Sequence, residues 1–304
     1  MQIGTNQFYD TGSSQLSKLS AKADALNTQI ATTKRFTAPS ADVVAYTRLA
    51  TIKQATADGA AYASNVSLAK SLLAQSDSTL SAVSTQLQRA AELTTQAANG
   101  TLNDTDRKTI AIDLQSIRDD LVNLAGTKDV RGQPLFGAAT GTTAVTQAAD
   151  GTVSFGGTGE ASAIPVADGT AIQATDSARR VFGAIPTSGG GTTDVFALLS
   201  TFVTALNAGG DVSTATGTAA NGLQAALTQV SSVQGSVGAR AARLDIVSTQ
   251  ATDAAGAREL DRSALEDTDQ SSAIVELQKT MTVLSATQAS FTKLNSLSLF
   301  DYLK

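Results

Sequence analysis

Residue types that could carry chemistry are scarce in this chain of 304 residues, because it contains no Cys and no His. Their absence removes the thiol nucleophile, the usual general base at neutral pH and the commonest zinc ligand. Only carboxylates, Ser, Thr, Lys and Tyr remain, and no paired arrangement of them stands out along the chain. The sequence therefore predicts no catalytic residue, no cofactor and no metal. An enzyme is the least favoured of the alternatives considered below.

Two short clusters nevertheless contain residues of the kind found at binding sites. Asn103, Asp104 and Asp106 offer oxygen ligands for calcium. However, Lys108 occupies a position that needs an oxygen, and the glycine of a calcium loop is missing. The run 189–191 is Gly-Gly-Gly and could surround a phosphate, yet no Lys-Ser/Thr pair follows it. We interpret the first cluster as a helix cap and the second as a flexible turn.

Composition limits the partners of the chain. Charged residues make up only 16% and the net charge is −5, so there is no basic surface for nucleic acid. No run approaches the roughly 18 apolar residues of a membrane-spanning helix, which predicts no membrane insertion. The first residues, Met1 to Gly4, lack the charged and apolar regions of a cleaved signal. We expect a cytoplasmic protein, or one exported without a cleaved signal peptide.

Both ends of the chain carry a narrow apolar seam with coiled-coil spacing. Near the N-terminus, apolar residues recur at steps of three and four, with Lys18, Lys22 and Asn27 among the polar residues of the outer face. The C-terminal seam keeps the same steps except at Gln288. The seam residues are Leu16, Leu19, Ala23, Leu26 and Ile30 at the first end, and Ile274, Leu277, Met281, Leu284 and Phe291 at the other.

A seam this narrow cannot bury itself, so each end needs partner helices. We expect the two ends to pair with each other and with other copies of the chain, which points to assembly and not to catalysis. The alternative is that both are ordinary core helices of a monomeric bundle. The predicted assembly interface consists of Leu16, Leu19, Leu26, Ile30, Ile274, Leu277, Met281, Leu284, Phe291, Leu297, Leu299 and Phe300.

Long helices are also expected between these ends. The first helix is predicted over residues 11–33, and Pro39 ends it, with Ser40 as a candidate cap for a second helix over about 41–99. A third is predicted from its cap at Asn103 to Gly126. Two stripes mark their buried faces: Ala69, Leu73, Ser76, Leu80, Val83, Leu87, Ala90, Thr94 and Ala97 in the second, and Ile110, Leu114, Ile117, Leu121 and Leu124 in the third.

The composition changes in the middle of the chain. Residues 132–222 hold 16 of the 24 glycines and three of the four prolines. Residues 145–155 and 164–172 carry Asp-Gly pairs between β-compatible residues, which predicts two hairpins with two-residue turns. One helix is predicted within this insert, between a cap at Thr193 or Asp194 and Gly209. The helical pattern returns at Leu223 and continues with little interruption to the C-terminus.

These elements predict a mainly α fold with a β-rich insert, in which a long coiled-coil-like bundle is made from both termini. We expect three nested domains: 1–33 with 265–304 as a terminal coiled coil, 34–137 with 222–264 as a helical core, and 138–221 as a β-rich insert with one helix. Each of the two outer domains would be built from both ends of the sequence.

Several stretches of the chain resemble one known family. They include the basic, proline and serine segment 34–42, the stretch 88–107 with Gln-Arg-Ala-Ala-Glu-Leu at its start, the segment 132–138, and the ending 297–303. All resemble the bacterial flagellin family. The last two are similar to its hook–filament junction branch, hook-associated protein 3, since filament flagellins typically end in a short aliphatic and arginine sequence.

This resemblance implies a flagellin-like fold of nested domains and an extracellular structural subunit of the bacterial flagellum. It implies export unfolded through the flagellar type III apparatus, with a chaperone holding the C-terminal segment beforehand. The assembled copies would join the hook to the filament, between hook-associated protein 1 and flagellin. We also consider a flagellin that polymerises into filament, and a secreted adhesin or carbohydrate-binding module in which residues 138–221 are functional.

Overall fold

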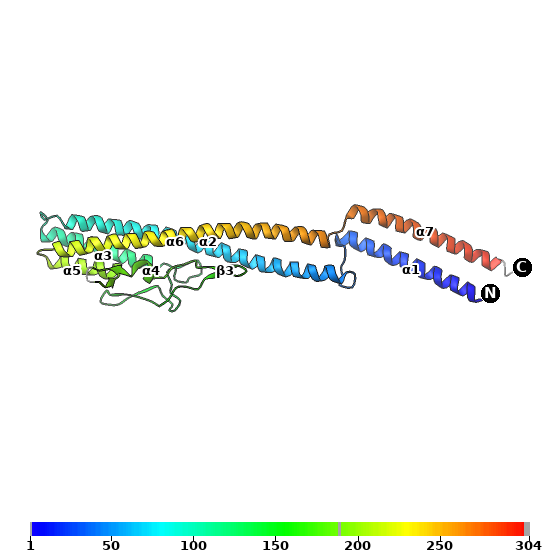
Figure 1. The fold of residues 1–304 in the computed structure, drawn as a ribbon, viewed down its shortest axis with the longest axis horizontal. Coiled ribbons are helices and arrows are strands. Elements are labelled where there is room, and N and C mark those ends of the chain that lie inside the picture. The colour runs from blue at the N-terminus through cyan, green and yellow to red at the C-terminus, as the bar shows by residue number, and fades with distance from the viewer. Residues whose placement is uncertain (1, 188–189, 301–304) are drawn as a thin grey trace. The chain divides into compact units, whose positions relative to one another are not determined.

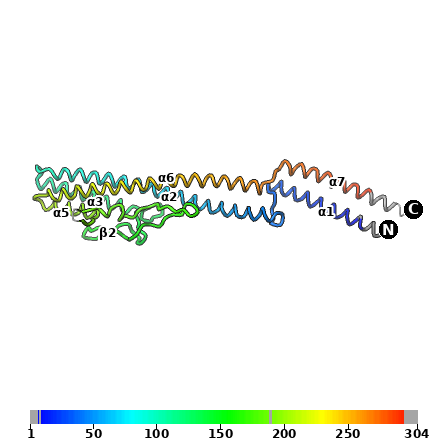
Figure 2. The backbone as a smooth tube through the Cα atoms, viewed as in Figure 1, coloured from blue at the N-terminus to red at the C-terminus, as the bar shows by residue number. Residues whose placement is uncertain are grey.

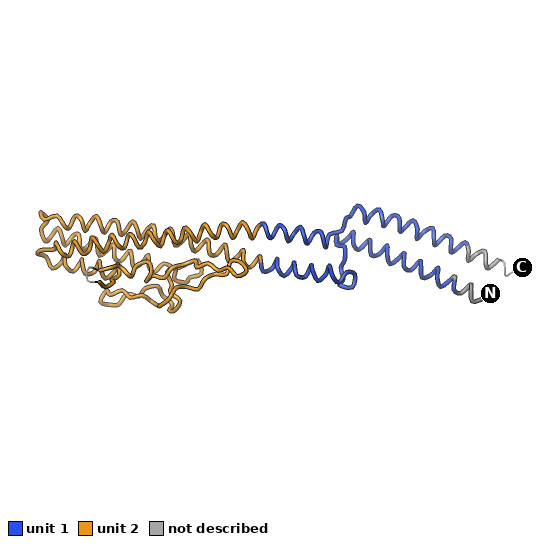
Figure 3. The backbone as a smooth tube through the Cα atoms, in the orientation of Figure 1, with its two compact units in different colours: residues 1–58, 253–304 blue, residues 59–252 orange. Residues whose placement is uncertain are grey.

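The structure, a computed structural model, describes residues 2–187 and 190–300, and for residues 2–6, 8 and 294–300 it describes the backbone alone. The chain divides into two compact units, each drawn in its own colour in Figure 3. Unit 1 comprises residues 1–58 and 253–304, and unit 2 comprises residues 59–252. This division does not follow the predicted domain boundaries, and those three domains stay predictions.

Seven helices account for most of the described chain (Figure 1). They are α1 (Gln2–Thr32), α2 (Val43–Ala97), α3 (Asp104–Ala125), α4 (Ala178–Phe182), α5 (Val195–Ala208), α6 (Ser213–Glu266) and α7 (Gln270–Phe300). The unit boundaries fall inside α2 and α6, so each of these two helices contributes residues to both units. The mainly α fold is therefore confirmed.

Unit 2 has one hydrophobic core, to which its helices and the insert both contribute. All nine residues of the stripe predicted between Ala69 and Ala97 are buried, as is the predicted stripe of α3 up to Leu121. α3 packs along α5, and their ribbons run side by side in the tube of Figure 2. Close packing at α6 depends on a glycine, because a Cβ on Gly222 would lie 2.6 Å from the Leu198 side chain. The 3.6-residue period therefore identified the buried faces correctly.

The strands of the insert form three separate antiparallel pairs. They are β1 (Val145–Gln147) with β2 (Val153–Phe155), β3 (Ile164–Ala167) with β4 (Thr170–Ile172), and β5 (Ile185–Pro186) with β6 (Thr192–Thr193). Both predicted hairpins are present, but β5 and β6 were not predicted. Insert side chains such as Val166 and Phe182 are buried in the same core as the helices. The Phe182 ring meets Phe136 edge-on, with centroids 6.0 Å apart.

The two hairpins turn differently. Asp168 and Gly169 alone connect β3 and β4, as predicted, and Gly169 has φ +63°. The prediction of a two-residue turn was wrong for the first hairpin, where Ala148 N–H donates to the Thr152 carbonyl. Gly151 N–H donates to the Ala148 carbonyl there, and its φ is +84°. Gly151 thus occupies the left-handed third position of a three-residue loop, residues 149–151.

Several predicted helix ends were also wrong. α1 begins at Gln2 instead of Thr11, and α6 begins at Ser213 instead of Leu223, because tertiary context overrides the low helix propensity of residues such as Gly and Thr. Asp42, and not Ser40, caps α2, since its Oδ1 accepts the Ala45 N–H at 2.9 Å. Residues 267–269 separate α6 from α7, within the stretch predicted to be helical with little interruption. The caps predicted at Asn103, Gly126, Asp194 and Gly209 are all confirmed.

Candidate assembly interface

The terminal helices α1 and α7 pack along each other in unit 1 (Figure 1). They run antiparallel, since Tyr9 contacts Phe291 near one end of the pair and Lys22 contacts Glu276 nearer the other. The α7 positions that are buried or half-buried against this seam step by four and three residues, as in a coiled coil. Apart from Glu276, which is half-buried and pairs with Lys22 of α1, they are Ala273, Leu277, Thr280, Leu284, Thr287 and Phe291.

Specific contacts fix the register of this pair. The rings of Tyr9 and Phe291 meet edge-on, with centroids 5.7 Å apart and planes at 88°. Gly12 lets the Phe291 ring approach, because a Cβ at Gly12 would lie 2.8 Å from it. Lys22 Nζ donates to Glu276 Oε1 at 2.5 Å, and this hydrogen bond lowers the pKa of the Glu276 carboxyl. Because the pair is exposed, it contributes to register more than to stability.

The residues predicted for the assembly interface lie in three kinds of place. Seven are half-buried along the α1–α7 seam: Leu16, Leu19, Leu26, Ile30, Leu277, Leu284 and Phe291. Ile274 and Met281 remain 42% and 48% exposed, so α1 does not cover them. The side chains of Leu297, Leu299 and Phe300 lie outside the described residues. Their common role in assembly stays a prediction.

Apolar residues of α7 also face away from α1. Ile274 and Met281 are one heptad apart and share a flank of the helix beside the seam, here called the α7 flank. Val275 on the far side is 64% exposed, and Val283 on the other flank is 44% exposed. On α1, by contrast, Lys18, Lys22 and Asn27 are exposed, as predicted for its polar outer face. A helix that is apolar on several sides is suited to more than one partner helix.

A group of charged residues where α1, α2, α6 and α7 meet was not predicted. Glu266 ends α6, and its side chain is only 5% exposed. Its carboxylate is 2.7 Å from Lys34 Nζ, 2.9 Å from Arg262 Nη1 and 3.7 Å from Lys53 Nζ. The spacing of Glu259, Arg262 and Glu266 by three and four residues was a signal for pairing within the helix, but not for Lys34 or Lys53.

The three cations determine the charge state of Glu266. The hydrogen bond from Lys34 is the largest influence lowering the pKa of the Glu266 carboxyl. Burial acts in the opposite direction, while Arg262 and Lys53 lower the pKa further. Glu266 is therefore ionised across the physiological range, as is required of a buried carboxylate that keeps cationic partners.

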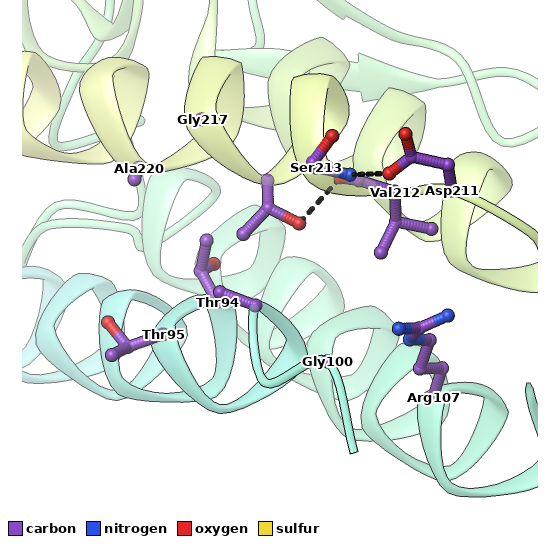
Figure 4. A pocket seen from close by; sticks show the side chains of 11 residues that line it. Thr94, Thr95, Gly100, Arg107, Asp211, Val212, Ser213, Gly217 and Ala220 are labelled. Atoms are coloured by element: carbon purple, nitrogen blue, oxygen red, sulfur yellow. Dashed lines mark hydrogen bonds between the residues drawn. The ribbon is translucent and has the colours of Figure 1, made fainter. Parts of the chain in front are cut away.

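A pocket of about 430 Å³ lies in unit 2 beside the start of α6 (Figure 4). Thr94, Thr216, Arg107 and Asp211 are among its polar lining residues. The Thr94 and Thr216 hydroxyls donate to carbonyls of their own helices, and Asp211 Oδ1 accepts the Ser213 N–H at 2.9 Å. The dashed lines in Figure 4 mark the bonds of Thr216 and Ser213. Arg107 Nη1 donates to the Gly210 carbonyl at 3.0 Å. These groups stabilise helix ends, and the lining pairs no nucleophile with a base.

The two sequence clusters considered above as binding sites, residues 103–106 and 189–191, differ in what the structure describes of them. Asn103 Oδ1 accepts the N–H groups of Thr105 and Asp106, and the Asp106 carboxylate accepts the Asn103 N–H at 3.4 Å. These bonds form a capping box, which confirms that the cluster is a cap. Gly189 in the second cluster lies outside the described residues. Among the helices that the structure describes, none has the length and apolar character needed to cross a lipid bilayer.

Comparison with known proteins places these features in context. Residues 3–141 match the bacterial flagellin N-terminal helical region. The chain is 31% identical over 326 aligned residues to the flagellar hook-associated protein 3 of Salmonella typhimurium, covering 99% of each chain.

Two solved structures share the fold. A putative flagellar hook-associated protein from Vibrio parahaemolyticus is similar with a TM-score of 0.66 and 21% identity, over 75% of this chain and 100% of that one. The flagellar junction protein FlgL from Legionella pneumophila is similar with a TM-score of 0.56 and 16% identity, over 66% of this chain and 99% of that one. At such identities the likeness shows the fold alone.

Proposed function

Because this chain belongs to the flagellar hook-associated protein 3 family, we propose that it is a structural subunit of the bacterial flagellum that joins the hook to the filament. The observation that carries this proposal is the 31% identity along the whole chain. It is supported by the terminal helix pair, in which α1 covers only part of the apolar surface of α7. In this role the chain supplies contacts between subunits and catalyses no reaction.

Assembly would occur through the terminal helices. Ordering a residue costs roughly 1 to 2 kcal/mol in conformational entropy, and two paired helices alone bury little surface to offset it. We therefore expect α1 and α7 to be largely unfolded in the free subunit and to become ordered when other subunits cover them. The exposed α7 flank supports this mechanism, since Ile274 and Met281 would be buried only in the assembly.

The partners follow from the same role. Other copies of the chain would pack beside it, with hook-associated protein 1 on the hook side and flagellin on the filament side. The location would be extracellular, after export through the flagellar type III apparatus. A chaperone is expected to hold the C-terminal segment before export, since that segment carries the exposed apolar residues.

Deletion of residues 275–304 tests this function most directly. A strain that produces the shortened chain should keep its hooks and lose its filaments under the electron microscope, while the full-length chain restores them. Filaments of normal number and length on the shortened chain would contradict the proposed role. Extended polymerisation of the purified full-length chain by itself would instead favour a filament flagellin.

A further inference from the structure

The two linkers that lead into the terminal helices are fastened to each other. Residues 33–36 begin the linker between α1 and α2, and residues 267–269 connect α6 to α7. These two segments, together with Glu266 at the end of α6, are called the joint below. Arg35 N–H donates to the Glu266 carbonyl at 2.7 Å, and Thr268 N–H donates to the Thr33 carbonyl at 2.9 Å. Both linkers belong to unit 1, and Figure 1 shows them passing next to each other.

Side chains reinforce these backbone bonds. The Glu266 carboxylate forms ion pairs with Lys34 of one linker, Lys53 of α2 and Arg262 of α6. One buried carboxylate thus connects three segments of the chain. Arg262 also pairs with Asp267 at 3.3 Å and with the exposed Glu259 at 2.8 Å. Breaking such a buried group by removing one charge leaves the remaining charges without compensation.

The joint also determines where both terminal helices start and stop. Thr33 has φ +59°, a left-handed conformation that ends α1 and is costly for a β-branched residue. Asp269 begins α7, because its carboxylate accepts the N–H groups of Ser271 and Ser272. Phe36 packs with Ala45 and Leu49 in a small cluster of their own, separate from the core of unit 2.

We propose that Glu266 is a positioning residue for assembly, which keeps the joint closed in the free subunit while the rest of α1 and α7 is unfolded. Starting a helix pair is costly because the chain ends must first be brought together and the first turns ordered. In a closed joint the two ends are already together and the adjoining turns are already ordered. The helix pair can then extend outward from residues 32 and 270. This inference rests on the proposed ordering of the terminal helices during assembly.

Trypsin can test the proposal, because Lys34 and Arg35 are cleavage sites inside the joint and Lys18 and Lys22 are cleavage sites in α1. The full-length chain would be digested briefly at low protease concentration and the fragments identified by mass spectrometry. We expect rapid cleavage after Lys18 and Lys22, and cleavage after Lys34 and Arg35 at least tenfold slower. Cleavage after Lys34 and Arg35 that is as rapid as the rapid cleavage after Lys18 and Lys22 would overturn the proposal.

A pair of variants assigns the effect to Glu266. In Glu266→Gln, cleavage after Lys34 and Arg35 should become about tenfold faster relative to Lys18, which corresponds to about 1.4 kcal/mol. Glu259→Gln is the matched control, because Glu259 also pairs with Arg262 but its side chain is 65% exposed, against 5% for Glu266. The same rate in both variants would contradict the role of Glu266, provided that circular dichroism shows both to be folded.

Amide hydrogen exchange on the unmodified chain provides a second test, which does not depend on a variant that folds. The Arg35 and Thr268 amides should exchange at least tenfold more slowly than α1 amides between residues 12 and 22. Exchange of the Arg35 and Thr268 amides as fast as in an unfolded chain would refute the closure of the joint. If Lys18 and Lys22 instead resist trypsin as well as Lys34 does, the terminal helices are ordered in the free subunit. That result would refute the proposed ordering on assembly, while the Glu266→Gln comparison would still decide whether Glu266 closes the joint.

Discussion

The α7 flank offers the sharpest test of assembly, because it is exposed in the isolated chain and would be buried only by another subunit. Burying a whole Met side chain contributes about 1.5 to 3 kcal/mol, and Met281 is 48% exposed. Covering the remainder is therefore worth about 1 kcal/mol for each subunit. A carboxylate at position 281 would lose this contribution. Burying its charge in the interface between subunits would cost roughly several kcal/mol more.

We therefore predict that Met281→Glu leaves the free subunit unchanged and prevents filaments from being attached. The matched control is Ala286→Glu, which adds the same charge to an exposed position on the other side of α7. Each variant would be expressed in a strain that lacks the natural chain, and swimming and filament number would be scored by microscopy. The amount of exported subunit in the medium shows whether a loss arises before assembly.

The expected result is exported Met281→Glu subunit with few or no filaments, beside Ala286→Glu with normal filaments. Circular dichroism and thermal unfolding of the purified chains should agree with those of the unmodified chain, since exposed substitutions usually change stability by about 0.5 kcal/mol or less. Normal filaments on Met281→Glu would refute the reasoning, because they would show that no subunit covers the α7 flank.

Four further predictions concern single positions. Leu80→Ala, in the core of unit 2, should lower the free energy of unfolding in urea by about 2 to 5 kcal/mol. Asn103→Ala should lower it by about 1 kcal/mol, because the capping box at α3 is lost. Gly169→Ala should cost about 1 kcal/mol in thermal unfolding, because its φ of +63° disfavours a side chain. The joint should loosen in acid, because the pKa of Glu266 is lower in the folded chain than in the unfolded one. The stabilisation by Glu266 is complete above about pH 4.5 and is lost as the pH falls through the pKa of the folded state. The loss should be visible as a shift of the Arg35 amide signal in NMR spectra.

Each of these predictions has a control and an outcome that would contradict it. Ile112→Ala, at a position 67% exposed on α3, should cost far less than Leu80→Ala, and equal costs would be inconsistent with the core described. Asn103→Asp should retain most of the stability that Asn103→Ala loses. Gly100 has neither a positive φ nor a close neighbour, so Gly100→Ala should be milder than Gly169→Ala. An Arg35 amide that is insensitive to acid would exclude Glu266 as the group that closes the joint.

Patterns of hydrophobic residues were reliable wherever a helix buries one face. All nine stripe positions of α2 are buried, including Ser76 and Thr94, whose small size permits close packing. The caps at Asn103 and Asp194 were recognisable for a local reason, since the side-chain oxygen bonds to amides two or three residues away. Such features depend on neighbours in the sequence and can be read without knowledge of the fold.

The sequence was less informative where the partner of a residue lies far away along the chain. Of the predicted C-terminal seam, Leu277, Leu284 and Phe291 are half-buried against α1. Ala273 and Thr280 are buried there as well, whereas Ile274 and Met281 stay exposed and their role in assembly stays a prediction. The apolar pattern around α7 allowed both registers, and the packing of α1 selected one. Likewise, nothing near Glu266 indicates Lys34, which is 232 positions earlier in the chain (266 minus 34).

The sequence by itself therefore determined the helical class and the buried faces of the long helices, because periodicity and caps are local properties of the chain. It also carried the resemblance to the family, while the need of both ends for partners stays a prediction. Only the tertiary structure decided which side of α7 faces α1, how the insert shares the core of unit 2, and that a buried carboxylate joins the two linkers. Those outcomes depend on contacts between segments distant in sequence, whose free energies arise only when the folded chain brings them together.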